Sequence, residues 1–179
     1  MGHDKSGMKI GGKPMLQRAV DALRENFSPV FISVRSLPAN VPEGTVALAD
    51  LVPGCGPISG LHAALSATDS GAVFLCAVDL PFIRPDAARY LCSRIGDFDA
   101  CVIRRENGYT EPLFAVYKKS CLTAATSMIE NHEYRMSALL DACNVLYISE
   151  LEINDPDTLL MNVNTPQEYL HASELAERK

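Results

Sequence analysis

Residues 72–82 read Ala72-Val73-Phe74-Leu75-Cys76-Ala77-Val78-Asp79-Leu80-Pro81-Phe82 and carry the clearest structural signal in the chain. Seven apolar residues lead to the carboxylate of Asp79, and a proline follows two residues later. A continuous apolar run that ends at a turn signal predicts a strand buried on both faces of a sheet. Asp79 is therefore expected at the carboxyl end of a buried strand, the edge where open α/β sheets bind ligands.

A carboxylate at that edge can hold Mg²⁺, a hard cation that prefers oxygen ligands and usually also bridges substrate phosphates. The alternative is that Asp79 only caps the next turn or helix, because aspartate is common at such positions. Asp50 follows a second predicted strand, residues 46–49, and is expected on the same rim. Two carboxylates there could both bind one metal ion, or one could bind the metal and the other a base or ribose. The alternative is two unrelated turn residues.

Size and charge limit the classes of protein to consider. The 179 residues suit one domain, and the hydrophobic fraction of 47% and charged fraction of 21% are near ordinary globular values. The net charge of −6 and the lack of a basic stretch argue against nucleic-acid binding. No apolar run approaches the ~18 residues that a membrane helix requires, and the polar start of the chain has no apolar signal core.

The six cysteines include no Cys-x-x-Cys pair, and the four histidines lack the spacing of a zinc site. Cysteines in apolar stretches, such as Cys76 and Cys101, usually behave as small buried hydrophobes. These patterns predict a reduced, soluble, cytoplasmic protein.

Strand and helix patterns alternate along the chain, which predicts an α/β fold of three layers, with a mostly parallel sheet and helices on both faces. Residues 149–161 are acidic, contain a proline and are expected to form a surface loop. Helices are predicted at 13–26, 61–67, 85–95, 120–131, 135–142 and from 165 onward; strands are predicted at 29–34, 46–49, 72–79, 100–103, 112–117, 145–148 and 161–164.

Gly54, Gly56 and Gly60 surround a predicted helix start. Glycine lets the backbone approach a ligand closely, and a helix N-terminus offers N–H groups to a phosphate or a base edge. The alternative is an ordinary tight turn, and the spacing matches neither Gly-x-Gly-x-x-Gly nor the P-loop. Lys5, in a polar N-terminal segment, could pair with a phosphate or could simply be a solvated lysine.

Several short segments, taken together and in this order, resemble the molybdenum cofactor guanylyltransferases, a family within the larger nucleotidyltransferase (Rossmann-like) fold. The segments are Met1-Gly2-His3-Asp4-Lys5, Gly11-Gly12-Lys13-Pro14-Met15-Leu16, Pro53-Gly54-Cys55-Gly56-Pro57-Ile58-Ser59-Gly60-Leu61, Val78-Asp79-Leu80-Pro81-Phe82, Glu111-Pro112-Leu113-Phe114-Ala115-Val116-Tyr117 and Asn162-Val163-Asn164-Thr165-Pro166.

This resemblance implies transfer of GMP from GTP to the phosphate of molybdopterin, with release of pyrophosphate. It implies GTP and molybdopterin as ligands, molybdoenzymes or their chaperones as partners, and neither nucleic acid nor membrane. The implied catalytic residues are Lys5 at the triphosphate and Asp79 at Mg²⁺. The implied nucleotide-binding residues are Lys5, Ser33, Asp50, Gly56, Pro57, Gly60 and Asp79, and the implied pterin-binding residues are Arg135, Asn162 and Asn164.

The chain departs from the family at its start. The family opens with a strand and a Leu-Ala-Gly-Gly phosphate loop, whereas this sequence begins at the Met-Gly that follows them. We therefore expect residues 1–179 to form a single nucleotidyltransferase domain, truncated at its N-terminus relative to the family. A start assigned too late or a segment lost in cloning is the favoured explanation; the other is a chain that is not a competent enzyme.

Two other functions stay open at this point. One is a related nucleotidyltransferase that uses CTP or a sugar phosphate, since Asp79 and Lys5 would serve it equally. The other is a non-catalytic protein that binds the pterin or a partner, which the missing phosphate loop would permit.

Overall fold

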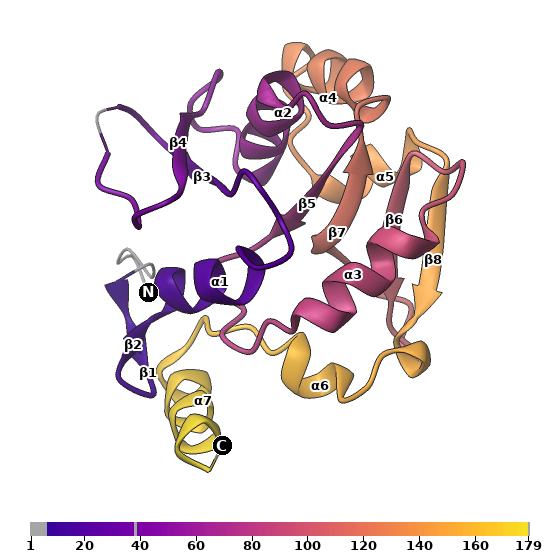
Figure 1. Ribbon diagram of the computed structural model, residues 1–179. Coiled ribbons are helices and arrows are strands. Elements are labelled where there is room, and N and C mark those ends of the chain that lie inside the picture. The colour runs from indigo at the N-terminus through magenta and orange to yellow at the C-terminus, as the bar shows by residue number, and fades with distance from the viewer. Residues whose placement is uncertain (1–6, 38, 179) are drawn as a thin grey trace.

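The computed structural model describes residues 7–37 and 39–178, which form an α/β fold with helices on both faces of a central sheet (Figure 1). The strands are β1 (Lys9–Ile10), β2 (Lys13–Pro14), β3 (Phe31–Val34), β4 (Val46–Ala49), β5 (Ala72–Cys76), β6 (Ala100–Arg104), β7 (Thr110–Lys118) and β8 (Val145–Ser149). The helices are α1 (Met15–Leu23), α2 (Pro57–Ala67), α3 (Pro85–Arg94), α4 (Cys121–Glu130), α5 (Met136–Asp141), the 3₁₀ helix η2 (Glu150–Glu152), α6 (Pro156–Leu159) and α7 (Pro166–Glu177).

The largest sheet has the strand order β5-β7-β6-β8. β5 and β6 both pair antiparallel with β7, while β6 and β8 pair in parallel, so β5, β6 and β8 run in one direction. A second, two-stranded parallel sheet consists of β3 and β4. The α/β class with helices on both faces of a mostly parallel sheet is confirmed.

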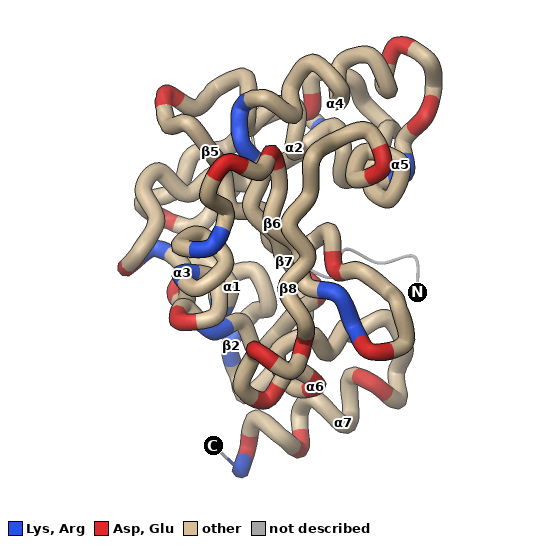
Figure 2. Tube along the Cα trace, turned by 90° about the vertical axis from the view of Figure 1, so that its right-hand side faces the viewer, with Lys and Arg blue, Asp and Glu red and all other residues tan. Residues whose placement is uncertain are grey.

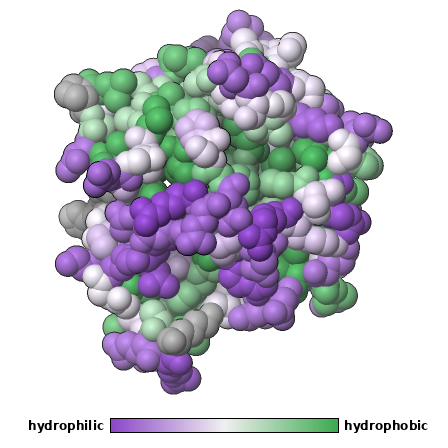
Figure 3. Space-filling view, in the orientation of Figure 1, coloured by the Kyte–Doolittle hydropathy of each residue, from purple (hydrophilic) through white to green (hydrophobic). Residues whose placement is uncertain are grey.

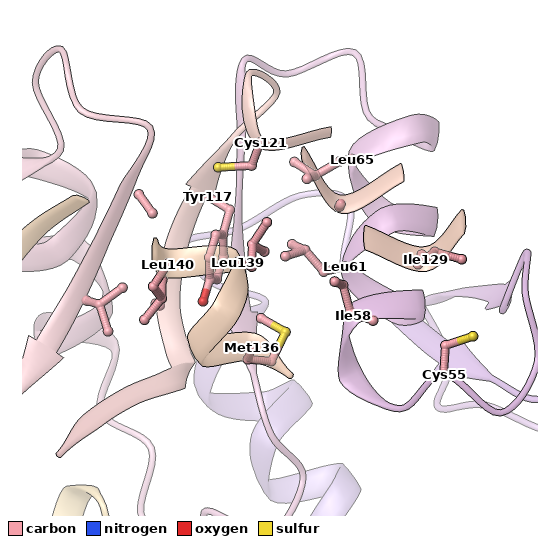
Figure 4. Packing of buried hydrophobic residues seen from close by; sticks show 14 residues of the cluster. Cys55, Ile58, Leu61, Leu65, Tyr117, Cys121, Ile129, Met136, Leu139 and Leu140 are labelled. Carbon is pink, nitrogen blue, oxygen red and sulfur yellow. The ribbon is translucent and has the colours of Figure 1, made fainter. Parts of the chain in front are cut away.

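Both faces of the large sheet are covered, which explains its continuous apolar strands. Alternate residues of a strand point to opposite faces. Ala100 and Val102 of β6 accordingly pack with α2, α4 and α5 (Figure 4), whereas Cys101 and Ile103 pack on the opposite face with α3 and α6. All four residues are fully buried.

A groove of about 330 Å³ separates the two sheets. It is lined by apolar side chains of α1, β3, α2 and β5, and β3 and β5 belong to different sheets. The prediction that the 72–79 run is a strand buried on both faces was therefore wrong in two respects. β5 ends at Cys76 rather than at Asp79, and its residues are only half-buried because it is an edge strand beside the groove.

The first helix is shorter than predicted because a hairpin precedes it. β1 and β2 pair antiparallel around Gly11 and Gly12, whose φ angles are +58° and +76°. Two consecutive residues with positive φ are the signature of the two-residue hairpin turn that favours Gly-Gly. Lys13 and Pro14 consequently belong to β2, and α1 begins at Met15.

Three other expectations are corrected. Residues 161–164 do not form a strand, and residues 149–161 are not simply a surface loop. η2 and α6 lie there, and Ile153, Leu159 and Leu160 are buried against the face that carries α3, which makes this segment part of the core. α2 begins at Pro57 rather than Leu61, because proline suits the first turn of a helix. The other predicted helices and strands are present with small shifts in their ends.

Acidic and basic residues are interspersed on the side seen in Figure 2. On the face shown in Figure 3, a hydrophilic band covers α1 and α3, and more apolar surface lies above it. No helix within residues 7–37 and 39–178 is long and apolar enough to cross a bilayer. The assignment of residues 1–179 to one truncated domain stays a prediction.

Candidate functional site

Three of the predicted nucleotide-binding residues meet at the ends of β3 and β4. Ser33 lies on β3, and its Oγ donates a hydrogen bond of 2.7 Å to Oδ1 of Asp50, the residue after β4. Asp50 is in register because its backbone N–H donates to the carbonyl of Val34 at 2.9 Å, which continues the parallel ladder. A carboxylate and a hydroxyl are thus fixed side by side on one rim of the small sheet.

Gly60 completes this cluster from α2. A Cβ atom at position 60 would lie 2.8 Å from Oγ and 3.0 Å from Cβ of Ser33, closer than real side chains approach. Glycine is therefore required here by close packing of the helix against β3. We call Ser33, Asp50 and Gly60 the serine cluster.

The loop before α2 presents backbone groups rather than side chains. Gly54 and Gly56 have φ angles of +86° and +68°, conformations that other residues adopt at a cost. The buried Ser59 donates its Oγ to the carbonyl of Val52 at 2.8 Å and so folds the loop back on the helix. Among the described residues no side chain caps the α2 N-terminus at Gly56. Pro57 has no N–H and the N–H of Ser59 donates to the carbonyl of Gly56 at 3.1 Å, so of the first three residues of α2 only Ile58 can offer a backbone N–H to a ligand.

Asp79 lies in the turn after β5, three residues beyond the end of the strand. Its backbone carbonyl accepts a hydrogen bond of 3.0 Å from the N–H of Val163. This bond holds the backbone between Asn162 and Asn164, which are predicted for the pterin side, against the turn that carries Asp79. We call Asp79, Asn162 and Asn164 the aspartate cluster.

The end of the Asn-x-Asn segment is fixed by the start of α7. Thr165 and Glu168 form a reciprocal capping box, as the sequence pattern predicts. The Glu168 carboxylate also accepts the backbone N–H of Asn164 at 2.7 Å. The helix cap therefore sets the backbone position of the aspartate cluster.

Arg18 holds the turn after Asp79, and sequence analysis missed it. From α1, its Nε donates to the carbonyl of Pro81 at 3.0 Å and its Nη1 to the carbonyl of Ile10 at 3.2 Å. The guanidinium also lies 5.7 Å from the ring centroid of Phe82. One side chain thus ties the β1–β2 hairpin to the turn that carries Asp79, and no local pattern in the sequence marks such a contact.

Arg135 lies in the connection between α4 and α5. The hydroxyl of its neighbour Tyr134 shares a hydrogen bond of 2.9 Å with Nδ1 of His132. Desolvation, followed by the proximity of Cys55 in the glycine loop, raises the pKa of the Tyr134 hydroxyl. Arg135 itself is 74% exposed and pairs with Glu133, with Nη2 to Oε2 at 2.7 Å and Nε to Oε1 at 2.9 Å. That pairing lowers the pKa of Glu133 to about 2. The arginine is therefore near the glycine loop but already partly neutralised.

Arg105 is a further partly buried arginine, and its partners lie within the protein. Arg105 forms ion pairs with Glu111 at 2.8 Å, Asp157 at 3.2 Å and Glu150 at 3.5 Å. This network joins β7 to the segment after β8 and needs no ligand to balance its charge. Lys5, predicted at the triphosphate, lies outside the described residues.

The structure brings the predicted residues into two clusters rather than one. The groove between the sheets is lined by Ser33 and Gly60 on one side and by Val78, the residue before Asp79, on the other. Both clusters follow the ends of strands or lie beside them, as expected for ligand-binding residues of an α/β sheet. No group of three or more His, Cys, Asp or Glu side chains that could cage a metal occurs in the described part of the chain.

This arrangement of strand-end carboxylates, glycine loop and uncapped helix start defines an α/β protein of the nucleotidyltransferase class. Comparison with known proteins gives the particular family. A model of the MobA-like NTP transferase domain matches residues 1–145, and the chain belongs to this family.

Curated relatives agree with that assignment. A protein of Pelotomaculum thermopropionicum named "Probable molybdenum cofactor guanylyltransferase" is 33% identical over 180 residues, which cover 99% of this chain and 87% of that protein. A protein of Pyrococcus furiosus with the same name is 33% identical over 82% of this chain and 76% of its own length.

Solved structures share the fold. The molybdopterin-guanine dinucleotide biosynthesis protein A of Archaeoglobus fulgidus matches with a TM-score of 0.86 and 23% identity over 99% of this chain and 93% of that one. The 2-C-methyl-D-erythritol 4-phosphate cytidylyltransferase of Thermus thermophilus matches with a TM-score of 0.74 and 16% identity over 97% and 94% of the two chains.

Proposed function

We propose that this chain transfers GMP from GTP to the phosphate of molybdopterin and releases pyrophosphate. The names of its curated relatives support this reaction. The structural observation that supports it most is the hydrogen bond of 3.0 Å from Val163 to Asp79. That bond joins the segment proposed for the pterin to the backbone of the residue proposed for the metal. A reaction between two phosphates requires their binding sites to be adjacent in this way.

In this proposal the nucleoside lies against the serine cluster. The backbone N–H groups of Gly56 and Ile58, on either side of Pro57, are proposed to face the base edge or a phosphate. The lack of a side chain at Gly60 lets α2 pack closely against Ser33. The hydrogen bond from Ser33 fixes one oxygen of Asp50, so the other oxygen can accept from a ribose or base donor. Lys5 is proposed to neutralise the triphosphate as a point charge.

Asp79 is proposed to hold Mg²⁺. The donor set fits this ion, because Mg²⁺ is usually bound through one or two carboxylates together with substrate phosphates and water, rather than in a cage of protein ligands. A single half-buried carboxylate on the rim meets that requirement. When bound, the ion supplies positive charge that stabilises the developing negative charge on the transferred phosphoryl group.

The chemistry requires little of the protein beyond position and charge. An oxygen of the molybdopterin phosphate forms a bond to the α-phosphorus of GTP, and the bond from that phosphorus to the β-bridging oxygen breaks. Alignment of the two substrates lowers the entropic part of the barrier. Asn162, Asn164 and Arg135 are proposed to orient the pterin, and no nucleophilic side chain is needed. The product is proposed to pass to molybdoenzymes or their chaperones in the cytoplasm.

Calorimetric titration with GTP in the presence and absence of Mg²⁺ tests the proposal. We expect Mg²⁺-dependent binding that falls at least about tenfold in Asp79→Asn, since a metal-bridged phosphate contact is worth more than ~1.4 kcal/mol. Asp97→Asn, in an exposed loop, is the matched control and should bind normally. Tighter binding of CTP than of GTP would replace guanylyl transfer with cytidylyl transfer as the function.

A second candidate is a non-catalytic pterin-binding role. It is favoured by the groove, which interrupts the sheet between the serine and aspartate clusters. Pyrophosphate release with GTP and molybdopterin decides between the two: release excludes the binding role, whereas pterin binding without nucleotide affinity supports it.

A further inference from the structure

Two cysteines from different parts of the chain meet at the end of the large sheet, away from both clusters. Cys121 is the first residue of α4, and Cys143 follows α5 just before β8. Their Sγ atoms are 3.7 Å apart, and both are free thiols. We propose that Cys121 and Cys143 are a reversible oxidation site, at which a peroxide converts the thiol pair into a disulfide that closes the segment between them.

The pair is held in place by Asp99. One carboxylate oxygen accepts from the hydroxyl of Ser120, the residue before Cys121, at 2.5 Å. The other accepts from the backbone N–H of Asn144, the residue after Cys143, at 3.0 Å. The backbone carbonyl of Asp99 also accepts from Cys121 Sγ at 3.3 Å. A single residue therefore fixes the flanks of both thiols, and these contacts hold Asp99 ionised by lowering its pKa.

The two sulfurs are close enough to bond after a small movement. A disulfide has an S–S distance of ~2.05 Å, so the sulfurs must approach by roughly 1.7 Å. Rotation about the side-chain torsion of the half-buried Cys143 can supply most of that movement, since Cys121 is fully buried. Figure 4 shows the Cys121 sulfur pointing away from Leu65, the neighbouring side chain of α2.

The thiols have different roles because their surroundings differ. The contact with Cys143, followed by burial, raises the pKa of the Cys121 thiol, which donates its proton to the Asp99 carbonyl. No carbonyl of the described residues accepts from the half-buried Cys143, whose sulfur contacts that of Cys121. The thiolate is the form that reacts with oxidants. Cys143, which is also the more exposed, is consequently the residue oxidised first, and Cys121 is the resolving thiol.

The reaction balances with hydrogen peroxide as the oxidant. The Cys143 thiolate attacks one peroxide oxygen, the O–O bond breaks, and Cys143 becomes a sulfenic acid while the second oxygen leaves as water after protonation. The Cys121 sulfur then attacks the Cys143 sulfur and displaces the sulfenic oxygen as a second water. Two thiols and one peroxide thus give one disulfide and two waters, and a thiol reductant reverses the bridge.

The bridge acts on a segment that touches the glycine loop. Residues 121–143 contain α4, α5 and the connection where Tyr134 lies beside Cys55. Linking the ends of this segment reduces the conformations available when it opens locally. Oxidation is therefore expected to slow hydrogen exchange in α5.

The test exposes the reduced chain to hydrogen peroxide and maps its thiols by mass spectrometry without reduction. We expect two of the six free thiols to disappear, a cross-linked peptide pair that contains Cys121 and Cys143, and full recovery with dithiothreitol. Cys143→Ser should abolish the cross-link, and Cys92→Ser, at the other half-buried cysteine outside the β5 strand, should retain it. Asp99→Ala should slow bridge formation about tenfold by loosening the alignment.

Three results would overturn the proposal. One is a bridge between any other cysteines or between two chains. Another is Cys143 oxidised to sulfinic acid while Cys121 stays a free thiol. The third is a Cys121–Cys143 bridge that leaves hydrogen exchange across α5 unchanged. That result would show that the disulfide does not restrict local opening of residues 121–143. Because Cys143→Ser is a small change at a half-buried site, the outcome does not depend on whether Cys121 variants fold.

Discussion

The large sheet and the β3–β4 sheet are built from similar apolar strands but differ in how completely they are packed. Residues 100–103 of β6 are fully buried between helices on both faces, whereas most residues of β3 and β4 are half-buried and β3 faces a groove of about 330 Å³. A strand is stabilised less by its own propensity than by what covers it. The serine cluster therefore lies on the less packed part of the fold, and the aspartate cluster borders it.

The largest expected effect comes from removing matched side chains in the two regions. Leu61 of α2 is fully buried in the large core, whereas Leu48 of β4 lines the groove. Leu61→Ala should lower the free energy of unfolding by ~2–5 kcal/mol, since it leaves a cavity. Leu48→Ala should cost about 1 kcal/mol, because its surroundings already contain space. Urea unfolding measures both, and equal losses would contradict the comparison.

Replacing a small side chain by a larger one should have different effects on the free energy of unfolding in the two regions. Ala125 of α4 is fully buried, so Ala125→Leu overpacks the core and should destabilise by ~1–3 kcal/mol. Ala64 of α2 lines the groove, where Ala64→Leu adds apolar contacts and should be neutral or stabilising. Thermal unfolding of the two variants measures this difference. If Ala64→Leu destabilised as much as Ala125→Leu, the groove would be closed in solution.

The serine cluster gives a smaller and more local effect. Alanine at position 60 is better than glycine in a helix, but its Cβ would lie 2.8 Å from Ser33 Oγ. Gly60→Ala should therefore destabilise by only about 1 kcal/mol while disturbing the Ser33–Asp50 hydrogen bond and weakening GTP binding. Calorimetry with GTP and urea unfolding separate these two effects.

Two further variants serve as controls for that experiment. Gly71→Ala adds a methyl group where nothing lies within 4 Å and should leave binding unchanged. The double variant Gly60→Ala with Ser33→Gly removes the clash and should recover stability without recovering binding. Normal GTP affinity in Gly60→Ala would show that the base does not contact this cluster.

The parts of the fold that follow from local pattern were predictable from sequence. Continuous apolar runs predicted the strands of the large sheet, and turn or capping residues predicted α7 and its Thr165–Glu168 box. The rule that ligands bind at strand ends predicted positions just after strands for Asp50 and Asp79, but the two residues follow strands of different sheets and do not share one rim. These inferences depend only on residues within one or two elements.

The contacts that complete the site are long-range and could not be predicted in this way. Arg18 and Pro81 are 63 positions apart. In a single sequence, nothing distinguishes Arg18 from a solvated arginine on a helix. The groove could not be predicted from the spacing of apolar residues either, because a half-buried edge strand and a fully buried strand can share one apolar pattern.

The smallest expected effect concerns charge at the edge of the well-packed region. Arg135 lowers the pKa of Glu133 from its ordinary value of 4.5 to about 2. A carboxyl whose pKa is lower in the folded state stabilises the fold above pH 4.5 and loses that contribution as the pH falls toward 2. Glu133→Gln should therefore flatten the acid limb of the stability curve slightly, because the pair is exposed to solvent. Glu130→Gln, at the exposed end of α4, is the control and should reproduce the parent curve. Carboxyl NMR titration gives the pKa directly, and a Glu133 midpoint near 4.5 would mean that Arg135 is free to meet a ligand.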